Sequence, residues 1–189
     1  MHTIRIFCLV FAFLMLPLAG CVDATQELLT AAGEGDLGNV EKMLTKGADV
    51  EFRADSGKTA LVLAAENGHS AVVETLVDAG ADMNATDDAG FTAMTHAASR
   101  GHIATAEALV AKGANIDPRD KVSRTPTSYA AENGHTVILQ TLLGQGASLE
   151  AIDVDGRTAL MWAALGGHSD TVKALLGGGA DVDATDGTR

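Results

Sequence analysis

The sequence predicts an all-α protein: a solenoid of helix–turn–helix units of about 33 residues, linked by β-turn fingers. The first observation is a repeat, because the dipeptide Gly-Ala returns at a constant spacing along the chain, from Gly47-Ala48 and Gly80-Ala81 to Gly179-Ala180. The pair Gly-His follows the same step from Gly68-His69 to Gly167-His168. The second observation is a composition that is 47% hydrophobic but only 4% aromatic, so Ala, Leu and Val form most of the apolar content. Small apolar residues let short helices stack closely in a regular array.

Residues 1–20 have the pattern of a secretory signal. Arg5 precedes an apolar run over residues 6–16, which is shorter than the about 20 residues that a transmembrane helix needs. The run is followed by Leu18-Ala19-Gly20-Cys21, which resembles the lipobox of bacterial lipoproteins. This resemblance implies cleavage after Gly20 and attachment of acyl chains such as palmitate to Cys21. The alternatives are an ordinary signal peptide with an incidental cysteine and an uncleaved membrane anchor.

Each full unit reads as a capped helix, a glycine turn and a second helix. In residues 54–86, Thr59 follows a polar turn and is placed to cap a helix that opens at Ala60. Apolar residues at helical spacing follow, and the helix stops at Gly68 because glycine readily adopts a positive φ. A second apolar helix then runs to Gly80.

Residues 21–189 contain five such units, at about 24–53, 54–86, 87–119, 120–152 and 153–185. The first lacks the polar turn, and Gly38 lies inside its second helix, which weakens a helix by up to about 1 kcal/mol relative to Ala. Terminal repeats of solenoids normally carry a polar outer face. The last unit ends in Gly177-Gly178-Gly179 without a capping unit, so we expect it to fray.

These columns resemble the ankyrin repeat, whose pattern of Thr-Pro-Leu-His, Ala-Ala, Gly-His, Leu-Leu and Gly-Ala has the same period. The likeness covers about residues 24–184. Thr125-Pro126 keeps the family's proline, and alanine replaces it in the other full units. The family's histidine after leucine is absent, so we expect looser coupling between repeats; its column holds Val62, Thr95, Ser128 and Met161.

Charge and motif content argue against several other functions. A formal charge of −12 argues against nucleic-acid binding, which needs clustered Lys and Arg. Histidines one repeat apart lie about 8–10 Å from one another, whereas zinc ligands converge within about 2.1 Å of one ion. We therefore interpret His69, His102, His135 and His168 as turn histidines that bond neighbouring backbone. The sequence has no phosphate-binding glycine loop and no nucleophile elbow, so we expect no cofactor, no metal and no enzyme activity.

One column on the first helices is a candidate contact surface. It contains Leu63, His96, Tyr129 and Trp162, and the last two are the only Tyr and Trp in the chain. Such aromatics dominate binding hot spots, although bulky residues here can instead pack under neighbouring turns. The turn tips and helix ends add apolar residues that we expect to be exposed and basic residues around them. The predicted partner-binding set is His96, Tyr129, Trp162, Phe91, Arg100, Val122, Arg124, Val154, Arg157 and Leu165.

These observations lead to a prediction of function. We expect a monomeric, lipid-anchored module of the bacterial envelope that binds another protein at the membrane surface, as a scaffold or adaptor. We expect it to face the periplasm, on the outer rather than the inner membrane, because Val22 rather than Asp follows Cys21. One alternative is an inhibitor or immunity-type protein that blocks a toxin or enzyme. A more remote alternative is an envelope enzyme.

Overall fold

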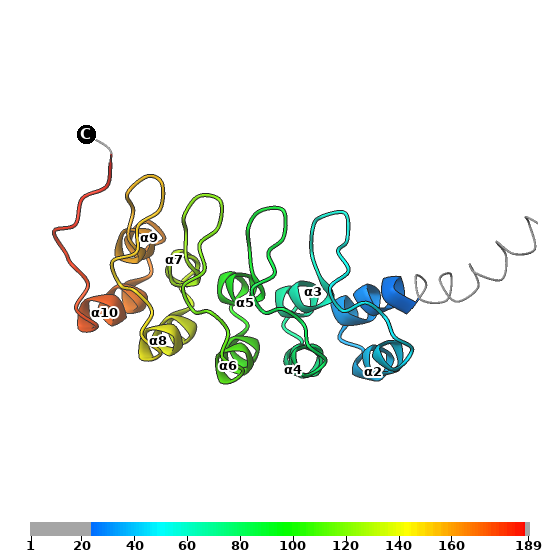
Figure 1. The fold of residues 1–189 in the computed structure, drawn as a ribbon. Helices are drawn as coiled ribbons and strands as arrows, with labels where there is room; N and C mark the ends of the chain where they lie inside the picture. Colours follow the sequence, from blue (N-terminus) through cyan, green and yellow to red (C-terminus); the bar gives the residue numbers. More distant parts are fainter. Residues whose placement is uncertain (1–23, 188–189) are drawn as a thin grey trace, which may run out of the picture.

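The computed structural model describes residues 24–187, so the predicted signal segment and Cys21 lie outside the described residues. Within this range all regular secondary structure is helical (Figure 1). The predicted all-α solenoid is therefore confirmed for the described chain. Its elements are a helix that includes residues 24–34, α2 (Leu37–Thr45), α3 (Ala60–Glu66), α4 (Ser70–Asp78), α5 (Ala93–Arg100), α6 (Ile103–Ala111), α7 (Pro126–Glu132), α8 (Thr136–Gly144), α9 (Ala159–Leu165) and α10 (Ser169–Gly177).

The helices form two parallel rows with a row of loops above them (Figure 1). One row holds α3, α5, α7 and α9, which begin at the same position of successive repeats, and the other holds α2, α4, α6, α8 and α10. We call the loops that precede the first row the fingers; they are residues 54–58, 87–91, 120–124 and 153–157. No helix in residues 24–187 is long and apolar enough to cross a membrane.

Threonine caps begin all four helices from α3 to α9 in the first row, as the sequence predicted. The side chain of Thr59 accepts a hydrogen bond from the backbone N–H of Val62, at 3.4 Å. The same bond recurs at Thr92, Thr125 and Thr158, and Pro126 follows Thr125 at the first helical position. Each cap satisfies a backbone donor that has no partner within the helix.

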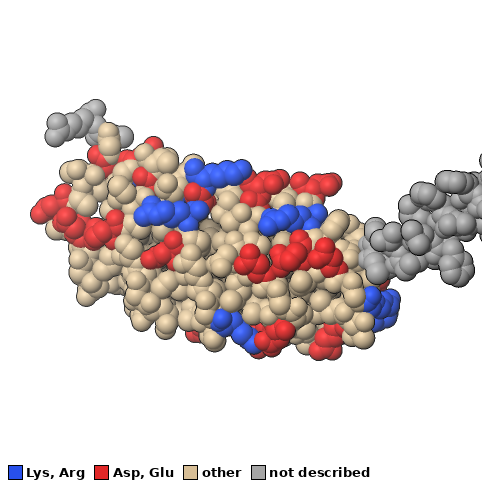
Figure 2. Space-filling model, viewed as in Figure 1, with Lys and Arg blue, Asp and Glu red and all other residues tan. Residues whose placement is uncertain are grey.

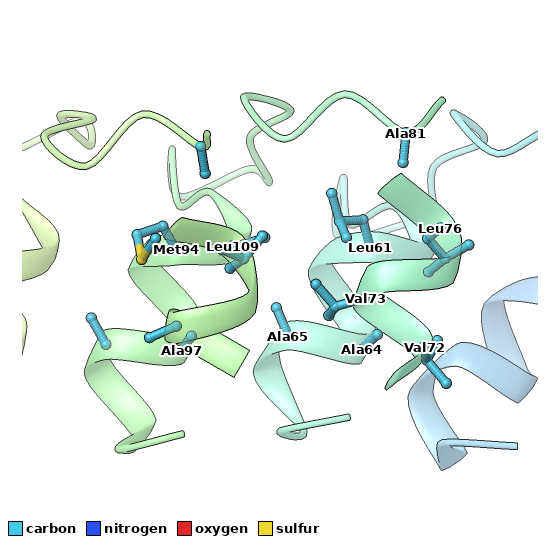
Figure 3. Close-up of a cluster of buried hydrophobic side chains, with 14 of the residues drawn as sticks. Leu61, Ala64, Ala65, Val72, Val73, Leu76, Ala81, Met94, Ala97 and Leu109 are labelled. Atoms are coloured by element: carbon cyan, nitrogen blue, oxygen red, sulfur yellow. The ribbon is translucent and has the colours of Figure 1, made fainter. Parts of the chain in front are cut away.

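Alanine pairs bring the two rows together. Ala64 and Ala65 have no exposed surface and lie among larger side chains, such as Leu61 and Val73, in the core drawn in Figure 3. A helix with only methyl groups on this face can approach its neighbours closely, while burial of each larger side chain contributes about 1.5–3 kcal/mol. Low aromatic content is thus a consequence of close helix packing.

Neighbouring repeats are also joined by hydrogen bonds from three kinds of group. The ring of His102 bonds the carbonyl of Glu66 at 2.9 Å, and His69, His135 and His168 make the same bond one repeat back. This confirms their interpretation as turn histidines. Fingertip backbones bond directly, with Val154 N–H donating to Val122 O at 3.1 Å. Arg53 and Arg119 each reach a carbonyl of the next repeat. In the column where the family has histidine, Thr95 and Ser128 instead bond the capping threonine of their own helix.

Candidate functional site

An aspartate fixes the shape of each of the last three fingers. Oδ1 of Asp87 accepts hydrogen bonds from the backbone N–H groups of Ala89 and Phe91, both at 2.9 Å. Asp120 and Asp153 make the same pair of bonds in their fingers, at 2.8–2.9 Å. The fingers are therefore held by charge-assisted bonds at their base, and their tips are presented in a defined shape.

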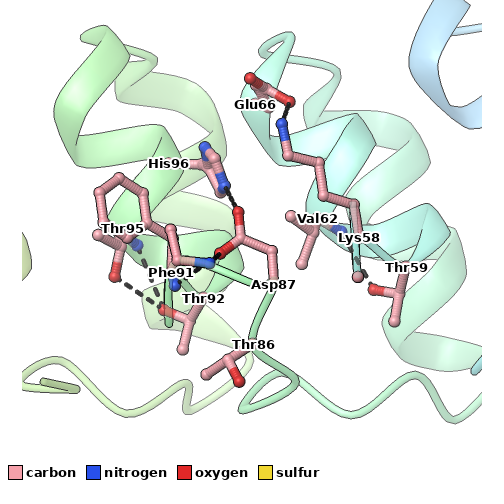
Figure 4. Close-up of polar contacts among 12 residues, drawn as sticks. Lys58, Thr59, Val62, Glu66, Thr86, Asp87, Phe91, Thr92, Thr95 and His96 are labelled. Atoms are coloured by element: carbon pink, nitrogen blue, oxygen red, sulfur yellow. Dashed lines mark hydrogen bonds and ion pairs between the residues drawn. The ribbon is translucent and has the colours of Figure 1, made fainter. Parts of the chain in front are cut away.

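The second oxygen of each aspartate holds the candidate contact residue of the following helix, nine residues later. Oδ2 of Asp87 bonds Nε2 of His96 at 2.8 Å, as drawn in Figure 4. Oδ2 of Asp120 accepts from the hydroxyl of Tyr129 at 2.6 Å, and Oδ2 of Asp153 accepts from Nε1 of Trp162 at 3.0 Å. One carboxylate thus ties each finger to the helix below it.

The first finger shows the apolar version of this link. Ala54 occupies the aspartate position and Leu63 the donor position, and both are half-buried against the core. Among the four fingers, aspartate therefore occupies this position only where the residue nine positions later can donate a hydrogen bond. That correlation is readable in the sequence, and it was the available signal for Asp87, Asp120 and Asp153, which our sequence-based set of site residues omitted.

Burial separates the members of the candidate contact column. His96 and Tyr129 are only 7% and 9% exposed, which favours packing under the fingers over direct contact with a partner. Trp162 is half-buried. Phe91 was expected to be exposed but is also half-buried, because its ring packs on His96 and Tyr129 with centroids 5.3 and 4.9 Å apart.

Two arginines extend the ring contacts into one continuous stack. The guanidinium carbon of Arg124 lies 3.9 Å from the ring centroid of Tyr129 and 4.0 Å from that of Trp162. Arg157 covers Trp162 at 5.1 Å. We call these six residues the ring stack: His96, Phe91, Tyr129, Arg124, Trp162 and Arg157. Cation–π contacts of this kind contribute about 0.5–2 kcal/mol each, so the ring stack stiffens the structure beneath the last three fingers. We call the ring stack together with Asp87, Asp120 and Asp153 the wall.

Burial and hydrogen bonding shift the acid–base behaviour of the wall. Burial lowers the pKa of His96 below its ordinary value, and the hydrogen bond that His96 makes to Asp87 only partly opposes this. Burial works to raise the pKa of Asp87, but bonds from His96 and from two backbone N–H groups outweigh it and lower that pKa. Burial and the bond to Asp120 both raise the pKa of Tyr129. The wall is therefore built for a neutral His96, an ionised Asp87 and a neutral Tyr129.

The exposed members of the predicted set lie around this wall. Val122 and Val154 are adjacent fingertip residues that are 44% and 65% exposed, and Leu165 at the end of α9 is 68% exposed. Arg100 at the end of α5 forms an ion pair with Glu66, which also binds Lys58 (Figure 4). Figure 2 shows basic and acidic side chains interspersed over the fingers and the first row of helices. Exposed apolar residues thus lie at two adjacent fingertips and at the end of α9.

The wall offers no cluster of metal ligands. Among residues 24–187, no group of three or more His, Cys, Asp and Glu side chains is placed to hold an ion. The carboxylates of Asp87, Asp120 and Asp153 are each occupied by three hydrogen bonds within the wall. This chemistry suits recognition by shape and charge.

Comparison with known proteins agrees with this architecture. The family described as "Ankyrin repeats (3 copies)" matches residues 28–120 and 117–186, which is nearly all of the described chain. No curated protein matches the sequence.

Proposed function

The chain belongs to the ankyrin-repeat family, a protein–protein interaction module, and from this premise we propose that its fingers and the adjoining helix ends bind another protein in the bacterial cell envelope. The binding strip consists of Val122, Val154 and Leu165, with Arg100 and Arg157 at its border. In this role the protein is a membrane-anchored scaffold or adaptor.

The exposed apolar strip is the observation that carries this proposal. Val154 and Leu165 are 65% and 68% exposed, whereas His96 and Tyr129 in the helices beneath the fingers are only 7% and 9% exposed. Exposed apolar groups with a charged border are typical of protein–protein interfaces. The residues at the centre of such a contact supply most of the binding energy when they become desolvated.

Rigidity of the supporting wall favours tight binding. The ring stack and the three finger aspartates hold the fingertips before a partner arrives, so little conformational entropy is lost on association. His96, Tyr129 and Phe91 therefore act mainly by holding the fingers in position. Trp162 is half-buried, and the guanidinium carbon of Arg157 lies 5.1 Å from its ring centroid.

Membrane attachment at Cys21 would place the first helix, and with it the N-terminal end of the stack, close to a lipid surface. Ala24 already belongs to the first helix, three residues after Cys21, and three extended residues reach at most about 11 Å. A stack tethered so closely meets partners that are themselves membrane-bound or recruited there. Several acyl chains hold such an anchor stably, whereas one chain binds only marginally.

Photo-crosslinking from the fingertip tests the binding proposal. A photoreactive residue in place of Val154 should capture a defined partner in intact cells, and the same residue in place of Gln140, exposed on α8, should not. Position 154 is preferable to position 162, because replacing Trp162 breaks its bond to Asp153. Val154→Asp should abolish capture from a second probe at position 165 without lowering the melting temperature. Equal capture from 140 and 154 would sink the proposal.

Membrane attachment is tested separately. Cys21→Ser should move the protein from the membrane fraction to the soluble fraction and abolish incorporation of a clickable palmitate analogue. Density-gradient separation of the membranes then tests outer-membrane placement. A wild-type protein that is processed yet carries no lipid would mean an ordinary signal peptide. Comparing the partner's own activity with and without this protein distinguishes an adaptor from an inhibitor.

A further inference from the structure

The C-terminal end of the stack carries an apolar groove that the fingertip proposal does not use. It has a volume of about 270 Å³ and lies against the last helix pair, α9 and α10. A second hollow, which includes Leu165 of the fingertip strip, adjoins it at Ala164. We call the groove alone the end face. Its larger apolar residues are Leu160, Met161, Val172, Leu176 and Val182, with Ala164 and Ala184 beside them.

In every preceding repeat the same positions are covered. Ala164 is exposed, whereas the alanines at this position in the other full repeats have no exposed surface; these are Ala65, Ala98 and Ala131. Met161 is half-buried, whereas its counterparts Val62, Thr95 and Ser128 are 1–2% exposed. What covers them is the helix pair of the next repeat, because α3 packs on α5, α5 on α7 and α7 on α9. The first helices of these covering pairs carry fully buried alanines, such as Ala97-Ala98 and Ala130-Ala131. The internal interfaces therefore show which kind of surface the end face fits.

The opposite end of the stack is different. In the first helix the exposed residues within 24–34 are Gln26, Glu27, Thr30 and Glu34, all polar. Within residues 24–187, the large apolar residues exposed by at least 40% all lie at or after Phe52, and Leu176 and Val182 on the end face are 42% and 71% exposed. The apolar end face is thus a property of the C-terminal repeat rather than of solenoid ends in general.

The charged residues around the groove indicate which kind of partner it can bind. Residues 153–187 contain six aspartates and only two basic residues, Arg157 and Lys173. Asp181 and Asp183 flank Val182 directly, and Figure 2 shows acidic side chains gathered at this end of the molecule. Two copies meeting through their end faces would bring these carboxylates together, which opposes self-association.

We propose that the end face binds an α-helix of another protein, one with Ala-sized residues along the contact and Lys or Arg at its borders. The helix lies along α9 and α10 as the next repeat would, with its small residues over Ala164 and Met161. Its basic residues reach Asp181 and Asp183. This site adds a second contact surface, at the end of the stack, and stands independently of the fingertip proposal.

A synthetic peptide provides the direct test. The probe is an amphipathic helix with an Ala/Leu face and Lys borders, free of aromatic residues, so that Trp162 is the only tryptophan in the mixture. We expect saturable binding by calorimetry and by Trp162 fluorescence. Ala164→Lys should weaken binding at least about tenfold. Val137→Lys is the matched control, since Val137 on α8 is 50% exposed and the charge change is identical, and it should leave affinity unchanged.

Further arms exclude the alternatives. A peptide with Glu in place of Lys should bind at least about tenfold more weakly than the Lys peptide. In the double variant with Asp181→Asn and Asp183→Asn, the ratio of the two affinities should be smaller. Equal affinity for both peptides, or equal effects of Ala164→Lys and Val137→Lys, would overturn the proposal. Concentration-dependent dimerisation that Ala164→Lys abolishes would also overturn it, in favour of a second copy. Val154→Asp should leave peptide affinity unchanged, which keeps this test separate from the fingertip proposal, and circular dichroism verifies that each variant folds.

Discussion

The link between Asp120 and Tyr129 should be measurable as a coupling free energy. Asp120 is only 8% exposed and accepts three hydrogen bonds at 2.6–2.9 Å, two from its own finger and one from the Tyr129 hydroxyl. Hydrogen bonds to a charged group contribute about 1.5–3 kcal/mol each, and water can replace part of this at the exposed fingertip. We therefore expect Asp120→Ala to lower the free energy of unfolding by about 3 kcal/mol.

Tyr129→Phe isolates the bond that joins finger and helix. In the wild type it removes only the hydroxyl from Oδ2 of Asp120, and we expect a loss of about 1.5 kcal/mol. In the Asp120→Ala background the hydroxyl has no acceptor there, so the same substitution should cost close to nothing. The double variant should thus be no less stable than Asp120→Ala alone, and the coupling free energy should be about 1.5 kcal/mol.

Urea denaturation followed by both Trp162 fluorescence and circular dichroism measures this cycle. Coincident transitions are required, because repeat proteins can unfold in parts. Thr59→Ala, two repeats away, is the control partner for Asp120→Ala, and the two effects should add within about 0.5 kcal/mol. A coupling between Asp120 and Tyr129 below about 0.3 kcal/mol would refute the view that the carboxylate ties the finger to its helix.

Three further predictions concern the glycine turns, the titration of His96 and the exposed C-terminal end of the stack. Gly134→Ala should lower the urea midpoint far more than Gly146→Ala. Both glycines have positive φ, but only at Gly134 would a Cβ lie 2.5 Å from the His168 ring. Equal losses of stability in the two variants would contradict this. The lowered pKa of His96 means that the unfolded chain binds a proton first, so stability is complete above about pH 6.5 and falls as the pH drops below it. His96→Tyr keeps a donor for Asp87 and should flatten this fall between about pH 7.5 and 5.5, whereas an unchanged slope would assign it to other groups. Amide hydrogen exchange should be faster in α10 than in α6, because within residues 24–187 no further repeat packs on the outer side of α10; equal protection would show that the last repeat does not fray.

The architecture was predictable from the sequence because it depends on local, periodic signals. Threonine caps, glycine turns and alanine pairs each act within one repeat, and a constant period repeats them in phase. The turn histidines were also interpreted correctly, because a histidine beside glycine at every turn can reach only the preceding repeat. The lipid anchor at Cys21 stays a prediction, since it lies outside the described residues.

The wall beneath the fingers was decided by tertiary structure. Residue type alone could not tell whether Tyr129 and His96 face a partner or the protein, since an aromatic ring with a polar end serves either purpose. Their low exposure and their hydrogen bonds to Asp120 and Asp87 favour packing, and each donor lies nine residues after its aspartate. Phe91 was expected at the surface because it lies in a finger, and packing against the neighbouring ring of Tyr129 leaves it half-buried.

What the sequence determined by itself was the repeat, its caps and turns, and the family to which the chain belongs. Only the tertiary structure decided which side chains are exposed to solvent. Val154 and Leu165 remain exposed at the fingertips and α9, and Ala164 lies uncovered at the C-terminal end although its counterparts are buried. The physical reason is that a repeat specifies its own helices locally, whereas the exposure of any residue depends on whether a neighbouring repeat covers it.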